Sequence, residues 1–161
     1  MGMYTYFIIK GTVKEQYRHK IQELYDVSKS GAIIPWQEPN YFEKLVDHVG
    51  FDLFKDFKTG QRSELIFYGS VDFDENVCEY NETTGEWHIE CDIKNYPEDG
   101  KEKNSMELFK DLIPELFEEG LFFSELYEEF DVPSEYELRN GELVLTNAKA
   151  VQEDREGFMY R

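Results

Sequence analysis

The clearest pattern in the chain is a strict alternation of apolar and polar side chains over residues 87–94. A period of two is typical of a β-strand with one buried and one solvated face. The predicted buried face consists of Trp87, Ile89, Cys91 and Ile93, and the polar face of His88, Glu90, Asp92 and Lys94. A second strand is expected over residues 64–73, which include β-branched and aromatic side chains. With a turn at Thr83-Thr84-Gly85, the two segments predict a long β-hairpin.

Two helices are expected in the first third of the chain, where apolar residues recur at helical spacing. Thr12 and Glu15 form a capping box that predicts the start of the first helix. A second capping box, Asn40 with Glu43, opens a shorter helix that ends at Gly50. The next few residues, 51–57, are expected to form one or two further helical turns.

A third helix is predicted behind a further capping box, Asn104 with Glu107. The apolar positions that it buries are Met106, Phe109, Leu112, Ile113, Leu116 and Phe117. Pro114 lies within this helix, so a kink is expected there. After Gly120, apolar residues again recur at helical spacing, which predicts a second helical segment over residues 121–130.

The remaining strands complete an α+β pattern. Residues 4–13 predict the first strand, and Asn140-Gly141 predicts the tight turn of a C-terminal hairpin within residues 136–151. The order of elements favours an antiparallel sheet of the ferredoxin-like, split βαβ type, covered by amphipathic helices. We expect a single α+β domain over residues 1–151 and a polar C-terminal tail, residues 152–161, that frays.

Acidic side chains are concentrated in one part of the chain. The protein has 161 residues, with 35 Asp and Glu against 17 Lys and Arg, and a net charge of −18. Residues 1–71 carry nine acids and nine bases, whereas residues 72–131 carry 20 acids and four bases, a net charge of −16. A field of this sign repels phosphates and anionic lipid and attracts basic surfaces. The charge therefore argues against direct binding to nucleic acid or membranes and favours a basic protein partner.

The sequence contains no common catalytic or cofactor-binding motif. GxSxG, GxxxxGK[ST] and GxGxxG do not occur, and His19, His48 and His88 do not have the spacing of metal ligands. Cys78 and Cys91 are too few for a disulfide framework and fit a reducing compartment. No run of apolar residues reaches the length of a membrane-spanning helix. We therefore expect a soluble, cytoplasmic protein that is not an enzyme and needs no cofactor or metal.

One enzymatic alternative remains open. Asp72 or Asp74, together with Asp92-Ile93-Lys94, resembles the Asp plus (Asp/Glu)-x-Lys core of a large superfamily of metal-dependent nucleases. In that superfamily carboxylates hold Mg²⁺ while a lysine orients the attacking water, and the metal stabilises the transferring phosphate. Against this alternative, Asp-x-Lys also occurs at residues 56–58 and 99–101, and phosphate binding normally needs a basic surface. A small-molecule-binding domain is a further alternative, because pockets leave little trace in a sequence.

The acidic stretch favours a binding role, because its acids fall on predicted elements and have aromatic residues among them. In composition the chain is similar to immunity proteins of nuclease toxins and to phage-encoded, anti-defence DNA mimics. We expect it to inhibit a basic, nucleic-acid-handling protein; the alternative is that the acids only keep the chain in solution. The residues expected to bind the partner are Glu86, Glu90 and Asp92 on the hairpin, Glu115, Glu118, Glu119, Glu125, Glu128 and Glu129 on helices, and Tyr80, Tyr96 and Tyr127.

Overall fold

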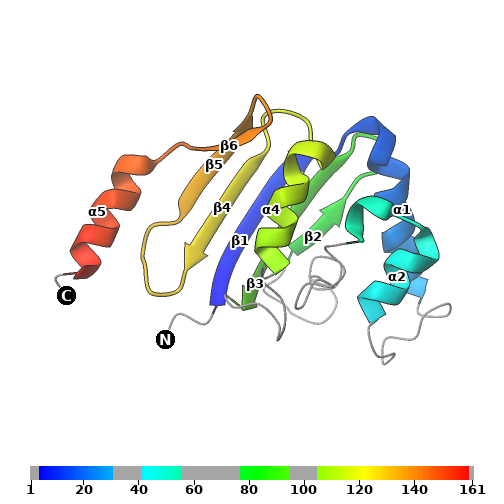
Figure 1. The fold of residues 1–161 in the computed structure, drawn as a ribbon, viewed down its shortest axis with the longest axis horizontal. Coiled ribbons are helices and arrows are strands. Elements are labelled where there is room, and N and C mark those ends of the chain that lie inside the picture. The colour runs from blue at the N-terminus through cyan, green and yellow to red at the C-terminus, as the bar shows by residue number, and fades with distance from the viewer. Residues whose placement is uncertain (1–3, 31–40, 56–76, 95–104, 160–161) are drawn as a thin grey trace.

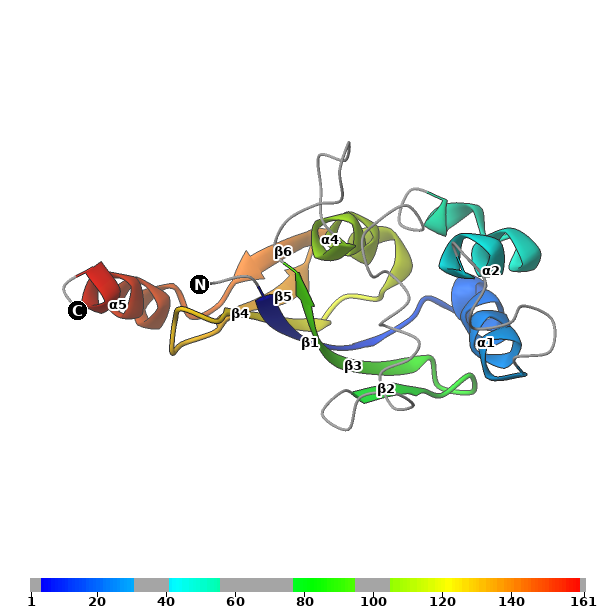
Figure 2. The same ribbon diagram turned by 90° about the horizontal axis from the view of Figure 1, so that it is seen from below.

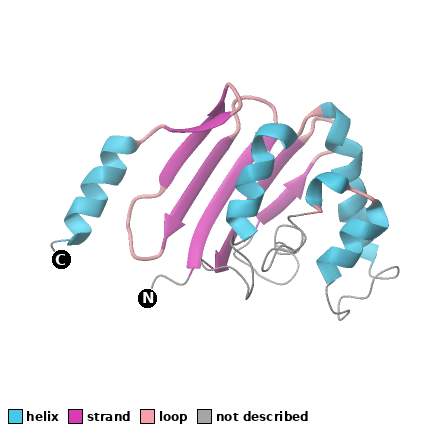
Figure 3. Cartoon of the chain, viewed as in Figure 1, coloured by secondary structure: helices cyan, strands magenta, loops and turns pink. Residues whose placement is uncertain are grey.

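A six-stranded antiparallel sheet forms the centre of the molecule (Figures 1 and 3). The structure, a computed structural model, describes residues 4–30, 41–55, 77–94 and 105–159. Its helices are α1 (Glu15–Ser30), α2 (Tyr41–Val49), the short 3₁₀ helix η1 (Asp52–Phe54), α4 (Ser105–Leu116) and α5 (Ala148–Met159). Its strands are β1 (Tyr4–Thr12), β2 (Val77–Tyr80), β3 (Glu86–Lys94), β4 (Phe122–Tyr127), β5 (Ser134–Arg139) and β6 (Glu142–Leu145).

The strand order confirms the predicted α+β fold with an antiparallel sheet. In space the strands follow the order β2-β3-β1-β4-β5-β6. β1 and β2, which α1 separates in the sequence, have β3 between them, and β3 and β4, which α4 separates, have β1 between them. This interleaving is the split βαβ arrangement that the sequence predicts. β5 and β6 extend the sheet beyond β4.

One face of the sheet carries the hydrophobic core and is covered by α4 (Figure 2). Phe7 and Ile9 of β1 are 0% exposed, and Trp87 of β3 is 1% exposed. The Trp87 ring makes an edge contact with Phe109 of α4 at 6.1 Å and stacks on Phe117 at 5.9 Å. The alternation over residues 87–94 therefore predicts the buried face correctly where the side chains are described, at Trp87 and Ile89.

α1 lies beyond the β2 edge of the sheet (Figure 1) and is joined to the β2–β3 hairpin by two side-chain hydrogen bonds. Trp87 Nε1 donates a hydrogen bond of 2.7 Å to the Tyr25 hydroxyl. The Tyr80 hydroxyl donates to the Arg18 carbonyl at 2.9 Å. Because buried Trp and Tyr side chains need partners for their polar atoms, these bonds fix how the helix meets the sheet.

Two turns take the backbone conformations that their residues favour. Asn140 and Gly141 join β5 to β6 with φ of 51° and 78°, as the sequence predicts for a two-residue hairpin turn. Gly85, before β3, has a φ of 78°, and a Cβ there would lie 2.8 Å from the Val13 carbonyl oxygen. Gly85 is therefore required both for its left-handed backbone and for its close approach to the backbone of Val13, directly after β1.

The prediction of a helix over residues 121–130 is wrong, because this segment contains β4. α4 ends at Leu116, and Gly120, with a φ of 92°, lies in the turn before β4. Phe123 of β4 then pairs with Ile9 across the sheet. Leu121 and Phe123 are buried at a period of two. The same apolar residues satisfy both periodicities, and pairing with β1 decides between them.

The capping box at Thr12 is also wrong: Thr12 is the last residue of β1 and pairs with Glu86. The hairpin partner of β3 is β2, whereas residues 64–73, predicted as that partner, lie outside the described residues. The β2–β3 register places Cys78 opposite Ile89. Most of the predicted C-terminal tail belongs to α5.

Candidate functional site: the uncovered face of the sheet

The second face of the sheet has no helix over it within the described part of the chain (Figure 2). We call it the open face. Alternation along β3 directs Glu86, Glu90 and Asp92 to this face, opposite to Trp87 and Ile89. The register adds Lys10 of β1 and Glu79 of β2, which are the two neighbours of His88. Glu79, Glu86, Asp92 and Lys10 are all exposed.

Glu90 is the most constrained acid of the open face. The Tyr6 hydroxyl of β1 donates to Glu90 Oε1 at 2.7 Å. His88 Nε2 lies 2.6 Å from Glu90 Oε2, although the geometry of this short contact is not that of a hydrogen bond. The Tyr6 hydrogen bond is the main cause that lowers the pKa of Glu90, with His88 and Lys10 lowering it further and desolvation opposing them. Glu90 therefore carries a negative charge that is held in place.

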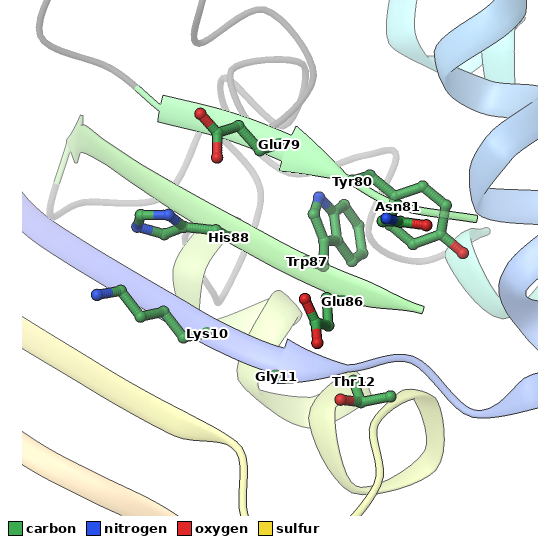
Figure 4. A pocket seen from close by; sticks show the side chains of 9 residues that line it. All are labelled: Lys10, Gly11, Thr12, Glu79, Tyr80, Asn81, Glu86, Trp87 and His88. Atoms are coloured by element: carbon green, nitrogen blue, oxygen red, sulfur yellow. The ribbon is translucent and has the colours of Figure 1, made fainter. Parts of the chain in front are cut away.

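A hollow of about 590 Å³ lies at the turn end of the open face (Figure 4). Lys10, His88 and Glu79 come to it from three neighbouring strands, and Glu86 and Thr12 extend it toward the turn. Its volume is within the range of ligand pockets, but such pockets are mostly apolar, whereas this one is bordered by exposed charged side chains. The arrangement suits a cationic side chain better than an enclosed small molecule.

The predicted partner-binding acids do not form a single array. Glu86, Glu90 and Asp92 lie together on the open face. The prediction that the remaining acids lie on helices holds only for Glu115 in α4. Glu118 and Glu119 follow α4, Glu125 lies in β4, and Glu128 and Glu129 follow β4 at the opposite end of the sheet.

Several of these acids form hydrogen bonds or ion pairs that connect elements of the fold. Glu115 accepts a hydrogen bond from the Tyr17 hydroxyl of α1, and Glu118 Oε1 lies 3.5 Å from Arg18 Nη2. Glu125 belongs to the helix-covered face, where Lys110 of α4 donates to both of its oxygens at 3.1 and 3.0 Å. These contacts fasten α4 to α1 and to β4.

The three tyrosines predicted to bind the partner differ in their positions. Tyr80 is half-buried, its hydroxyl is bonded to α1, and burial raises its pKa to about 12. Tyr127 is half-buried and lies 6.0 Å, between ring centroids, from Phe130. Tyr96 lies outside the described residues. Neither described tyrosine is thus an aromatic anchor on the open face.

Sequence reasoning missed three residues of the open face: Tyr6, Lys10 and Glu79. Lys10 follows the alternation of β1, so a strict reading of that strand would have placed it opposite to Phe7 and Ile9. Tyr6 lies on the same face of β1 by the same alternation, but its partner Glu90, 84 residues away, could not be predicted from the sequence.

The nuclease alternative gains no support from the described residues, none of which form a group of three or more His, Cys, Asp or Glu that could hold a metal ion. Asp92 is exposed, and Asp72 and Asp74 lie outside the described part. In the same part of the chain, no helix has the length and apolar character needed to cross a membrane.

Comparison of the chain with protein-family models, with curated proteins and with solved structures gave no match.

Proposed function

We propose that this protein is an inhibitor that binds a basic, nucleic-acid-handling protein through its open face and competes with the nucleic acid of that partner. The observation that supports the proposal best is the group of exposed acids, Glu79, Glu86 and Asp92, on neighbouring strands of a sheet face without a covering helix among the described elements. This is the role of an immunity protein or of a phage-type nucleic-acid mimic. We further propose that the protein acts in a reducing cytoplasm, where its two cysteines stay thiols.

Strand-borne acids suit this role because their positions are fixed before binding. Side chains on one face of a strand recur about every 6.8 Å, so β3 presents its acids in a regular row. A rigid row loses little conformational entropy when a partner binds, in contrast to a flexible acidic tail. The net charge of −16 over residues 72–131 would in addition speed the encounter with a basic partner.

The test compares two triple charge reversals in affinity capture from the native host. The first variant carries Glu79→Lys, Glu86→Lys and Asp92→Lys on the open face. The matched control carries Glu15→Lys, Glu43→Lys and Asp52→Lys, which change three exposed acids of the balanced N-terminal part by the same total charge. We expect the first variant to bind the captured partner at least roughly tenfold more weakly, and the control to bind within about threefold of wild type.

Salt provides the second arm of this test. The Debye length falls from about 10 Å at 0.1 M to about 3 Å at 1 M ionic strength, so capture by wild type should be lost at high salt. Equal loss of capture in both variants would support the view that the acids only keep the chain in solution. A Mg²⁺-dependent cleavage of DNA or RNA by wild type that Asp92→Ala abolishes would instead establish the nuclease alternative.

A further inference from the structure

The centre of the open face is apolar. Ile8 of β1 and Phe122 and Leu126 of β4 are directed to this face, and all three are half-buried. Ile8 pairs with Ser124, so Phe122 and Leu126 lie two residues to either side of that pair. At about 3.4 Å per residue, the apolar strip extends roughly 14 Å along β4. It is separate from the core, whose side chains point to α4 from the other face.

Acidic side chains border this strip on both sides. On the β1 side, β3 contributes Glu86, Glu90 and Asp92. On the β4 side, β5 contributes Glu135 and Glu137, which pair with Ser124 and Phe122. An apolar centre within a polar rim is the usual anatomy of a protein interface.

The basic groups of this face do not cancel its charge. Arg139 lies 2.9 Å from Glu137, which offsets one acid of the β5 rim. Lys10 is exposed on β1, where it pairs with Phe122 at one end of the strip. Among the described residues the open face still carries more acids than Lys and Arg: Glu79, Glu86, Glu90, Asp92, Glu135 and Glu137 against Lys10 and Arg139. The face as a whole is therefore complementary to a surface with an apolar centre and basic margins.

A helix has the dimensions for this surface. An α-helix with its side chains is about 10–12 Å across, and strands lie about 4.8 Å apart. A helix seated over the β1–β4 seam would therefore cover these two strands, and long cationic side chains on its flanks would extend to β3 and β5, which each lie about 7 Å from the seam. The opposite face of the same sheet already packs against a helix, α4, through Phe109 and Ile113, which are 0% exposed.

We propose that the open face binds an amphipathic α-helix of the partner whose apolar stripe is flanked on both sides by Lys and Arg. This inference rests on the proposed function and specifies the partner's binding element. The stripe covers Ile8, Phe122 and Leu126, and the flanking cations meet the acids of β3 and β5. A basic segment without an apolar stripe would contact the acids of β3 and β5 and leave Ile8, Phe122 and Leu126 uncovered.

The test uses two synthetic peptides of about 18 residues, long enough for five helical turns. The first has Leu at helical spacing with Lys on both flanks, and the second has the same composition scrambled so that no stripe forms. Fluorescence anisotropy in 0.15 M salt should show that the wild-type protein binds the first peptide roughly tenfold more tightly. The double variant Ile8→Thr, Leu126→Ser should lower that affinity to the level of the scrambled peptide.

Leu145→Ser is the matched control, because Leu145 is exposed and lies on β6 opposite Tyr136, on the other face; it should leave the preference unchanged. If the double variant does not fold, amide NMR of the wild-type protein decides: the first peptide should shift Ile8 and Ser124, and shifts confined to α4 would overturn the inference. If both peptides bind equally and the Glu79→Lys, Glu86→Lys, Asp92→Lys variant binds neither, the inference of a bound amphipathic helix is refuted and the proposed function is supported. Binding of neither peptide would count against both.

Discussion

Ile89 offers the sharpest test of which face of β3 is buried. Its side chain is 0% exposed and lies opposite Ile9 on β1 and Cys78 on β2. We expect Ile89→Asp to remove a fully buried apolar group and to place a carboxyl group in the core beside α4. The control change Glu86→Ala, on the open face of the same strand, removes an exposed side chain and should alter the free energy of unfolding by less than about 0.5 kcal/mol.

The magnitude has two parts. Loss of the buried isoleucine costs about 2 kcal/mol. The introduced carboxyl group avoids a buried charge by staying protonated, so its folded-state pKa is raised above the unfolded value of about 3.9. Keeping it protonated costs about 1.4 kcal/mol for each pH unit above that value, which is about 3 kcal/mol at pH 6 and about 5 kcal/mol at pH 7.5. The total destabilisation is therefore about 5 kcal/mol at pH 6 and about 7 kcal/mol at pH 7.5.

Urea unfolding followed by far-UV circular dichroism at the two pH values measures both numbers. The difference between variant and wild type isolates the introduced group, because the native titrations are common to both proteins. Ile89→Val, which keeps the side chain apolar, should cost only about 1 kcal/mol at either pH. A loss below 1 kcal/mol for Ile89→Asp, or a loss that does not change with pH, would show that this face of β3 is not buried.

Three further results are expected. Asp154→Ala removes a side chain that is 4% exposed and accepts two backbone N–H bonds from the β4–β5 loop, so urea unfolding should show a loss of about 1–3 kcal/mol and amide exchange in α5 should speed up. Gly85→Ala should lower stability by more than Gly141→Ala, for which the positive φ alone costs about 1 kcal/mol and the Cβ meets open space. Because the pKa of Glu90 is lowered in the folded state, its ionised carboxylate stabilises the fold above its ordinary pKa, and this stabilisation is lost as the pH falls through the lowered value. Tyr6→Phe should raise the folded-state pKa of Glu90, measured by carboxyl-carbon NMR, and should reduce this stabilisation.

The local periodicity of apolar residues predicted several elements of the fold correctly. The alternation around Trp87 and Ile89 and the helical spacing of Phe109 and Ile113 in α4 each reflect a single element against one core, and both predictions are confirmed. The helix predicted for residues 121–130 was wrong because the apolar residues of this segment fit a helix and a strand equally well. Only the pairing of Phe123 with Ile9, more than one hundred residues earlier in the chain, selects the strand.

The open face was harder to foresee, because it is assembled from strands that are remote in sequence. The concentration of acids in residues 72–131 is visible in the sequence, but the face to which each acid points depends on register. Glu125 and Glu90 illustrate this: the first is bonded to Lys110 beneath α4, and the second to Tyr6 on the open face. Charge along the chain therefore predicts a binding role but does not tell which face of the sheet carries the acids.

The central claim is that the open face competes with nucleic acid for a basic partner. The most direct measurement is a competition titration with the captured, purified partner bound to a fluorescently labelled oligonucleotide. The account predicts that wild type releases the oligonucleotide at near-stoichiometric concentration, and that the Glu79→Lys, Glu86→Lys, Asp92→Lys variant does not. A wild-type protein that binds the partner while the oligonucleotide stays bound, as a ternary complex, would contradict it.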